Sequence, residues 1–314
     1  MGMQRGTEGL GVIVAEEVAG ALATGKPVVA LESTLIAQGL PWPENLATAR
    51  ESEAAVRRAG GVPATVAVLG GVPRLGLTEA ELEGMARSPR SFLKASRRDL
   101  GRVVARGLDA ATTVSGTLFL ARAAGVGVMA TGGLGGVHRG AAETFDVSND
   151  LDELARADGF LVVCSGVKSI LDVPATLEVL ETRGVPVVGY RTDTFPGFTA
   201  RSSGLPLEAR VDTPPEAAAV VAAHRALGLP GAVVLGQPVP EAVALDHEAM
   251  EAALADALDQ ARSQGVTGKA VTPFLLDRLR TATGGRSLAA NTALIVANAG
   301  LAGEVAAALA AEGR

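Results

Sequence analysis

Short apolar runs recur along the chain, and each one ends in glycine or in polar residues. Such runs are typical of strands in a parallel sheet, because helices cover both faces of that sheet and leave no face for polar side chains. We expect strands at residues 27–31, 64–69, 127–130, 160–164, 186–190 and 232–235, and a short strand end at 92–94.

Segments with apolar residues at helical spacing separate these runs. They predict helices at residues 12–23, 44–59, 78–86, 113–124, 174–184 and 216–227, another that starts near Ser96, and a final helix from about Ser287. The alternation predicts an α/β fold, a three-layer α/β/α sandwich with a central, largely parallel (mixed) sheet. No linker of low complexity interrupts it, so we expect one domain over residues 1–314, with residues 1–10 frayed.

Composition and charge narrow the class of protein. Apolar residues make up 48% of the chain but aromatic residues only 3%, so Ala, Val and Leu must fill the core. A net charge of −6 argues against a nucleic-acid or anionic-membrane surface, since such binding needs clustered cations. The single cysteine, Cys164, lies in an apolar run, and neither a signal peptide nor a run of about 18 apolar residues is found. We expect a soluble cytoplasmic protein.

The candidate chemistry lies where predicted strands end, because ligands of open α/β sheets bind at the carboxyl ends of the strands. Glu32, Lys94 and Lys168 take such positions, as do residues 131–139 and 146–150. Spacing argues against the common alternatives: the chain has no G-x-G-x-x-G, no Gly-Lys-Ser/Thr triplet, no H-E-x-x-H and no G-x-S-x-G.

The glycine-rich turn at residues 131–140 has two interpretations. Its backbone N–H groups could bind a phosphate, or the glycines could serve the turn alone. Because His138 and Arg139 lie in the same turn, we favour anion binding.

Asp146 and Asp150 are four residues apart, so a partly helical segment would place both carboxylates on one face. Mg²⁺ or Mn²⁺ would suit such a pair, held mostly by water. An equally good interpretation is that Asp150 caps the helix that starts near Leu151.

Lys168 follows an apolar strand and a glycine. It could be an ordinary solvated cation. Partial burial would instead disfavour the charged form and leave a nucleophilic amine, which beside a sugar phosphate implies a Schiff base to an aldehyde.

Taken together, these motifs resemble the pseudouridine-5′-phosphate glycosidase family, also described as indigoidine synthase A-like. The resemblance rests on VVALEST (28–34), KASRRDL (94–100), ATGGLGGVHRG (130–140), KSILD (168–172), GKAVTPFLL (268–276) and Asn291. It covers almost the whole chain. It implies an α/β/α sandwich, a homotrimer, one divalent cation per subunit (Mn²⁺), and reversible conversion of pseudouridine 5′-phosphate and water into uracil and ribose 5-phosphate.

By position, the resemblance makes Glu32 the proton donor, Lys168 the covalent nucleophile and Asp146 the metal ligand. It assigns substrate contacts to Lys94, Val114, Thr131, His138, Ser148, Asn149, Asp150 and Asn291. Asn149 departs from the small residue expected there, as does Val167 after Gly166, which leaves the phosphate contacts around Ser148 open.

These residues suit a carbon–carbon glycosidic bond, which offers no oxygen leaving group for an acid to protonate. An amine bonded to C1′ of the opened pentose could expel uracil as it becomes an imine. Two alternatives use the same residues: a Lys-dependent sugar-phosphate aldolase, and a non-catalytic sugar-phosphate-binding protein in which Lys168 is only a counter-charge. A ribokinase-like kinase would need a Gly-Ala-Gly-Asp signature, which is absent.

Overall fold

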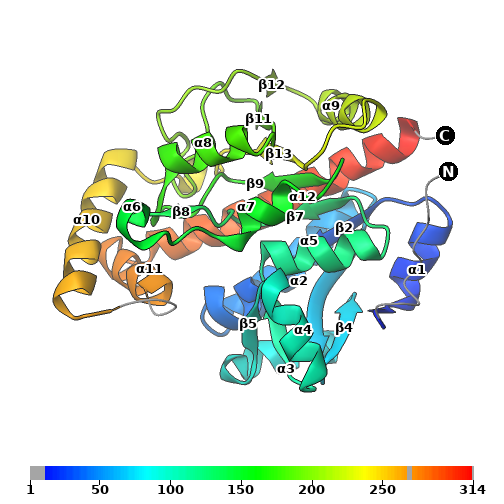
Figure 1. Cartoon of the computed structure of the whole chain (residues 1–314), viewed down its shortest axis with the longest axis horizontal. Coiled ribbons are helices and arrows are strands. Elements are labelled where there is room, and N and C mark those ends of the chain that lie inside the picture. The colour runs from blue at the N-terminus through cyan, green and yellow to red at the C-terminus, as the bar shows by residue number, and fades with distance from the viewer. Residues whose placement is uncertain (1–10, 267–270, 313–314) are drawn as a thin grey trace.

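A sheet of mostly parallel strands runs through the centre of the molecule (Figure 1). The computed structural model describes residues 11–266 and 271–312; the predicted frayed segment 1–10 and residues 267–270 of the GKAVTPFLL motif lie outside it. The strands follow the order β1 (Ile13–Val14), β4 (Val72–Leu75), β3 (Val62–Leu69), β2 (Val28–Leu31), β7 (Val128–Ala130), β9 (Leu161–Cys164), β13 (Val233–Gly236), β11 (Val187–Tyr190) and β12 (Arg210–Val211).

Two further pairs of strands complete the β-structure. β6 (Ala110–Thr112) pairs antiparallel with β3 and parallel with β5 (Leu93–Ala95). β8 (Val137–His138) and β10 (Leu171–Asp172) form a small antiparallel sheet beside the main one. Because β3 also pairs antiparallel with β4, the sheet is mixed, as predicted.

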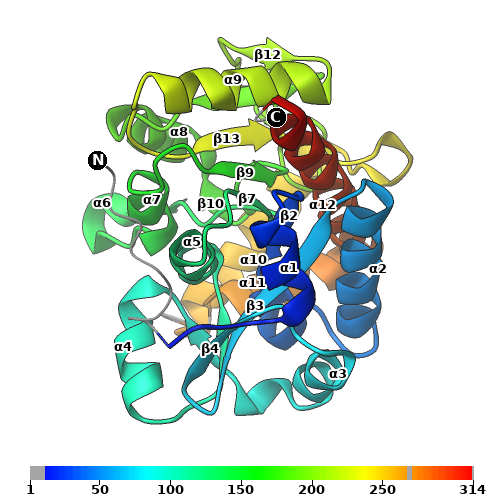
Figure 2. The ribbon, with the colours of Figure 1, turned by 90° about the vertical axis from the view of Figure 1, so that its right-hand side faces the viewer.

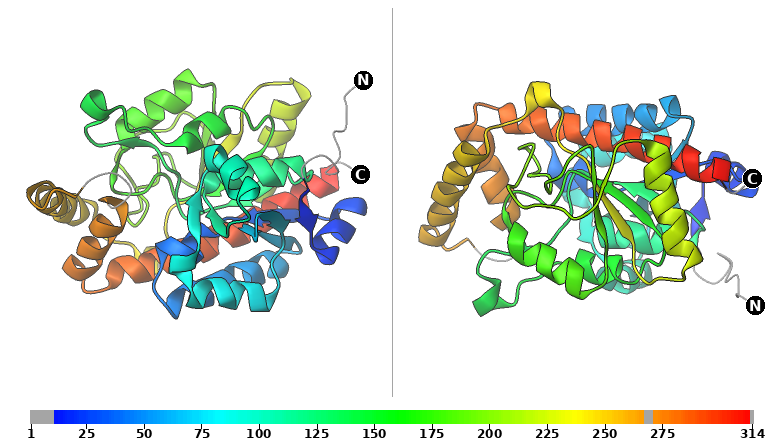
Figure 3. Two further views of the ribbon diagram at one scale, coloured as in Figure 1. Left: turned by 60° about the horizontal axis from the view of Figure 1, so that its bottom comes forward. Right: turned by 90° about the horizontal axis from the view of Figure 1, so that it is seen from above.

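Helices cover both faces of the sheet, which confirms the predicted three-layer fold (Figure 2). One face carries α1 (Glu16–Ala23), α4 (Arg97–Ala105), α5 (Val114–Ala123), α7 (Asn149–Leu154) and α8 (Val173–Thr182). The other carries α2 (Glu44–Arg58), α3 (Glu79–Arg87), α9 (Pro214–Ala226) and α12 (Arg286–Glu312). α10 (His247–Ser263) and α11 (Val271–Ala282) lie together at the end of the molecule farthest from α1 (Figure 3). Short turns complete the chain: η2 (Leu35–Gly39), η3 (Pro89–Ser91), α6 (Ala141–Thr144) and η4 (Glu241–Val243).

The apolar runs are strands because both of their faces are buried. In β9, Val162 and Cys164 pack toward the face of α5 and α7, whereas Leu161 and Val163 pack toward the face of α9 and α12. Burial also raises the pKa of the Cys164 thiol to about 12, so this cysteine acts as a small apolar side chain.

Helix α12 is long and apolar enough to span a membrane by length and composition, although half of its apolar stretch is buried inside this molecule. It packs against α2 and α9 and lies over β2, β7 and β9. We therefore describe it as a core helix. The sequence showed no unbroken apolar run here, because Asn291 and Asn298 interrupt it.

The largest differences from the predicted elements lie near the N-terminus. Residues Ile13–Val14 form a strand that pairs with β4, so the helix expected over 12–23 begins at Glu16. β4 itself was missed because it is short and contains Pro73. The predicted helix start at Thr78 is confirmed as a capping box with Glu81.

Candidate active site

A charged cleft of about 730 Å³ opens where β5, β6, β7 and β9 end. It brings together most of the residues that the sequence assigned to a site: Lys94, His138, Asp146, Ser148, Asn149, Asp150 and Lys168. Thr131, Glu32, Val114 and Asn291 are not among its lining residues. The predicted set is therefore divided between this cleft and its surroundings.

The glycine-rich turn and the Lys168 segment pair with one another for most of their length. The Ser165 N–H donates to Gly132 O (3.0 Å), Leu134 N–H donates to Gly166 O (2.9 Å), and Lys168 N–H donates to Leu134 O (3.2 Å). The β8–β10 ladder continues this pairing, with His138 opposite Leu171. The two loops thus form one rigid floor that fixes the backbone of Lys168.

This pairing changes the interpretation of the glycine-rich turn. Its N–H groups at Thr131, Leu134, Gly135, Val137 and His138 all donate to groups of the protein. The glycines serve close packing instead, because an added Cβ would lie 2.3 Å from Ser148 Oγ at Gly135 and 2.4 Å from Thr176 Oγ1 at Gly136. Many of the backbone N–H groups that were predicted to bind an anion therefore already donate hydrogen bonds within the protein.

Asp150 holds two parts of the site together. Its carboxylate accepts the Ser115 N–H at the start of α5 and the Gly135 N–H, both at 2.9 Å, and the residue is 4% exposed. Two of the three roles that the sequence offered, a helix cap and a metal pair with Asp146, do not match, and the third, a substrate contact, stays a prediction. Ser148, not Asp150, caps α7, and both Asp150 oxygens face backbone donors rather than a shared metal site with Asp146.

The possible metal ligands are few. Within residues 11–266 and 271–312, no group of three His, Cys, Asp or Glu side chains is arranged to hold an ion. Asp146 has an exposed carboxylate at the cleft, 3.9 Å from Nδ1 of His138. This donor set fits only a hard cation that one carboxylate holds and that water or substrate oxygens otherwise coordinate.

The cations of the cleft differ in their surroundings. Arg183 pairs with Asp152 at 2.6 Å, whereas no carboxylate in the described parts of the chain pairs with Lys168 or Arg98. Lys168 is half-buried and Lys94 is exposed on β5. Arg98 had no predicted role, although it lies in the same KASRRDL motif as Lys94.

Arg97, next to Arg98, has a structural role. It pairs with the buried Glu153 at 3.2 Å and lies over the ring of Phe119. Burial raises the pKa of the Glu153 carboxyl, and the nearby guanidinium of Arg97 opposes that shift. Of these two adjacent arginines, Arg97 therefore packs against the protein and Arg98 lines the cleft.

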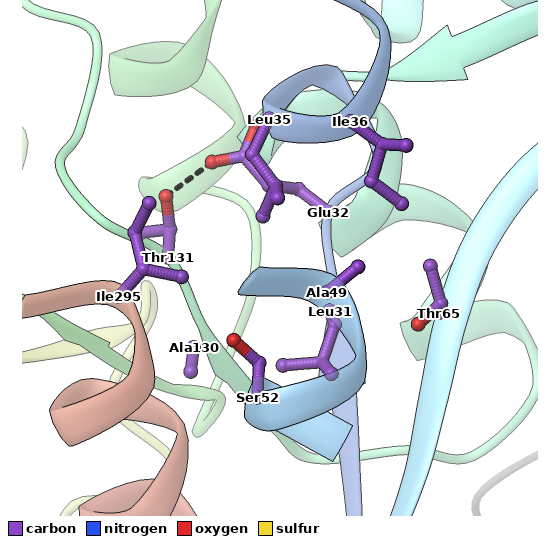
Figure 4. A pocket seen from close by; sticks show the side chains of 10 residues that line it. All are labelled: Leu31, Glu32, Leu35, Ile36, Ala49, Ser52, Thr65, Ala130, Thr131 and Ile295. Carbon is purple, nitrogen blue, oxygen red and sulfur yellow. Dashed lines mark hydrogen bonds between the residues drawn. The ribbon is translucent and has the colours of Figure 1, made fainter. Parts of the chain in front are cut away.

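Glu32 lies in a separate, tightly packed pocket (Figure 4). Its carboxylate accepts hydrogen bonds from the hydroxyls of Thr34 and Thr131, and Ile295 of α12 closes the pocket. The cavity measures about 10 Å³, which is too small for a substrate. Glu32 and Lys168 do not line a common cavity in this conformation.

Asn291 lines a second cavity of about 350 Å³ beside the cleft. Gln38 and Leu40, from the end of η2, and Phe198 form part of its wall, and Ser169 connects it to Lys168. Its charged members, Asp277 and Arg280, pair with each other at 2.7 Å. The cavity is thus effectively neutral, with amide, hydroxyl and apolar groups.

Val114 lies outside all of these cavities. Its side chain is 1% exposed in the core at the start of α5, so only its backbone is near the cleft, next to the lining residue Thr113. Asn298 is a polar residue of α12 for which the sequence predicted no role. It is buried, and it bonds to the strand ends beside Glu32. An asparagine inside an apolar helix was the available signal.

An α/β/α sandwich with a charged cleft at the carboxyl ends of its parallel strands defines a small-molecule binding or enzyme-type α/β protein. The model of the indigoidine synthase A like protein family matches residues 17–308. The chain belongs to this family, as its motifs suggested.

Curated relatives and solved structures agree with this assignment. Pseudouridine-5′-phosphate glycosidase from Streptomyces griseus is 55% identical over 306 residues, 97% of this chain and 94% of the relative. The protein of that name from Caldanaerobacter subterraneus is 51% identical over 293 residues, 93% and 95% of the two chains. The prealnumycin C-glycosynthase AlnA in complex with ribulose 5-phosphate is similar in structure (TM-score 0.89, 43% identity, 96% and 98% covered). So is an indigoidine synthase A-like protein from Thermotoga maritima (TM-score 0.85, 40% identity, 95% and 96% covered).

Replacing Asp150 by Ala is expected to lower the free energy of unfolding by about 2–4 kcal/mol, because one buried and one partly buried N–H group lose their acceptor. Urea denaturation without ligand measures this. Asp152→Ala on the same helix is the control, and loss of its partly exposed ion pair with Arg183 should cost less than about 1 kcal/mol. Equal losses in the two variants would contradict the role given to Asp150.

Proposed function

We propose that this protein is a pseudouridine-5′-phosphate glycosidase, an enzyme that reversibly cleaves the carbon–carbon glycosidic bond to give uracil and ribose 5-phosphate. The names of its curated relatives support this activity. The observation that carries the proposal is that Lys168 and Ser169, which are adjacent, line two cavities of different character.

A C-nucleotide has a charged end and a neutral end, with C1′ between them. The cleft of Lys168 is lined by hydroxyls, cations and carboxylates, and most of these carboxylates already have partners within the protein, so the cleft suits the ribose phosphate. The second cavity is effectively neutral and suits a planar base that offers N–H and C=O groups to amides such as Asn291. A substrate that spans both would place C1′ next to Lys168. The ribulose 5-phosphate bound by the related C-glycosynthase is also a pentose phosphate.

We assign the covalent step to Lys168. The ribose ring opens as the C1′–O4′ bond breaks and O4′ takes a proton, while Nζ of Lys168 loses a proton and bonds to C1′. The nitrogen lone pair then forms the C1′=N bond, and the electrons of the C1′–C5 bond pass to uracil. Water finally releases ribose 5-phosphate and the free amine. Because the backbone of Lys168 is fixed by the glycine-rich turn, little motion is needed to reach C1′.

Glu32 is our candidate for the proton donor to C5 of uracil. Consecutive residues of η2 line both its pocket and the neutral cavity: Leu35 and Ile36 face Glu32, and Ala37 and Gln38 face the cavity. The carboxylate is therefore close to where the base would lie. Reaching the base requires the thin wall of η2 to move, and π-type turns such as η2 are frequent at functional sites.

The divalent cation belongs to the same proposal. Asp146 would hold Mn²⁺ through its carboxylate, the kind of ligand that such a cation prefers. Bound there, the cation would neutralise phosphate charge, and His138 would orient Asp146. A homotrimer and a cytoplasmic location remain expectations from the family; light scattering in solution measures the trimer.

Purified protein is expected to release uracil from pseudouridine 5′-phosphate, and Mn²⁺ should restore this activity after chelation. Chromatographic detection of uracil is the measurement. A Lys-dependent aldolase would instead cleave the sugar without forming uracil, and a binding protein would leave the substrate intact. Activity that is identical with and without Mn²⁺ would remove the cation from the proposal.

Borohydride added with ribose 5-phosphate is expected to leave a stable adduct on Lys168, because reduction traps the imine. The other lysines, Lys26, Lys94 and Lys269, act as internal controls in peptide mass spectrometry. Labelling of one of those lysines in place of Lys168 would refute the assignment. No labelling at all would favour the sugar-phosphate-binding protein.

Glu32→Gln should bind pseudouridine 5′-phosphate but lose turnover by about 10²–10⁴-fold, since the amide cannot donate the proton. Calorimetry measures binding, and uracil release measures turnover. Glu304→Gln on the exposed face of α12 is the control and should match the wild type. Near-normal turnover in Glu32→Gln would exclude Glu32 as the proton donor.

A further inference from the structure

Asn298 is a fully buried amide on an otherwise apolar face of α12. It is 0% exposed among residues such as Leu294, Ile295 and Ala302. A buried amide is costly unless it is hydrogen-bonded, so its partners indicate why it is there. Those partners are not in its own helix.

The Asn298 side chain bridges the ends of two neighbouring strands. Nδ2 donates to Thr131 O, which directly follows β7, at 2.9 Å. Ser165 is the residue directly after β9, and its Oγ lies 3.1 Å from Nδ2 and 3.2 Å from Oδ1 of Asn298. One side chain therefore fixes both turns relative to α12.

Thr131 passes this constraint on to Glu32. β2 and β7 pair in parallel with Leu31 opposite Ala130, so the next residues, Glu32 and Thr131, lie side by side. The Thr131 hydroxyl donates to Oε1 of Glu32, and the Thr34 hydroxyl donates to Oε2. Figure 4 shows Thr131 directed at the carboxylate.

The backbone around Glu32 is fixed by other contacts. Ser33 exchanges hydrogen bonds with Thr112 of β6, and its hydroxyl donates to Val66 O of β3. What stays adjustable is the direction of the Glu32 side chain, and the two hydroxyls determine it.

Helix α12 also packs directly against the glycine-rich turn after β7. An added Cβ on Gly132 would lie 2.9 Å from Ile295, which is three residues before Asn298 on the same face of α12. The turn after β7 cannot shift toward the helix, and Asn298 prevents it from shifting away.

From these contacts we infer that Asn298 is a positioning residue for the Glu32 carboxylate and acts through Thr131. The inference rests on the proposed function, because it concerns the proposed proton donor. It also changes the role of Thr131, which the family resemblance assigned to substrate binding. Its hydroxyl faces Glu32 in a pocket too small for substrate.

The test compares Thr131→Val, Thr131→Ser and Asn298→Ala in the complete protein, with Glu304→Gln as the control. Borohydride trapping of ribose 5-phosphate on Lys168 measures the fraction of each variant that can form the imine. The kcat for uracil release is divided by this fraction, so that misfolded protein does not lower it. Thr131→Val and Asn298→Ala should each lower kcat about 10–100-fold with KM nearly unchanged, because a misplaced carboxylate slows proton transfer without weakening binding. Thr131→Ser, which keeps the hydroxyl, should restore most of kcat.

The double variant distinguishes positioning from a general loss of stability. If Asn298 acts through Thr131, the combined loss of kcat should be clearly smaller than the product of the two single losses. Three results would each overturn the inference. They are a wild-type kcat in Thr131→Val, a loss of kcat in the double variant that equals the product of the two single losses, and a kcat in Thr131→Ser as low as in Thr131→Val. Should Asn298→Ala fail to fold, Asn298→Leu, which fills a similar space without hydrogen bonds, takes its place, and a wild-type kcat in that variant would overturn the inference.

Failure of the proposed function has a different signature. The wild type would then release no uracil, and crystal structures of the wild type and Thr131→Val would give the answer instead. A Glu32 carboxylate that turns away in Thr131→Val supports positioning. An unmoved carboxylate contradicts it.

Discussion

The site depends on the close pairing of two loops that follow neighbouring parallel strands. The glycine-rich turn after β7 and the Lys168 segment after β9 exchange backbone hydrogen bonds from Gly132 to Leu171. Side chains at Gly135 or Gly136 would collide with Ser148 and with Thr176 of α8, so these glycines let the turn pack closely against its neighbours on that side. The pairing holds Lys168 at a defined point between a charged cleft and a neutral cavity.

Charge in the cleft is controlled by giving carboxylates local partners. Asp99 closes the capping box of α4, Asp150 accepts two backbone N–H groups, and Asp152 pairs with Arg183. A chain with a net charge of −6 can thus have a cleft whose lining includes Lys168 and Arg98, cations that no carboxylate of the described residues neutralises. Partial burial of Lys168 strengthens its field relative to bulk water.

Helix α12 contributes both to the hydrophobic core and to the surroundings of the site. Its apolar residues cover β2, β7 and β9, and Asn298 extends from the same surface to the strand ends. Hydrophobic packing therefore determines how accurately the groups beside Glu32 are placed. The same arrangement keeps Glu32 apart from Lys168 in this conformation, with η2 between its pocket and the neutral cavity.

The sequence by itself determined the class of fold and the family. Strand runs that are apolar on both faces, with helices between them, require a covered parallel sheet, and motifs such as VVALEST and KASRRDL carry the family assignment. It also placed Lys94, His138 and Lys168 at strand ends, where the structure joins them in one cleft. These features follow from local periodicity and from the rule for strand ends.

Only the tertiary structure decided what the polar groups contact. Asp150 appeared to be a cap or a metal ligand, but it binds amides that are 15 and 35 residues away in the chain. The amides of the glycine-rich turn appeared open to a phosphate, but Leu134 N–H donates to the loop after β9, and others donate to Asp146, Asp150 and Thr176. Thr131 faces Glu32 across 99 residues of sequence, and Asn298 reaches it from the last helix. Hydrogen bonds between distant segments depend on packing, and no spacing within the sequence encodes their geometry.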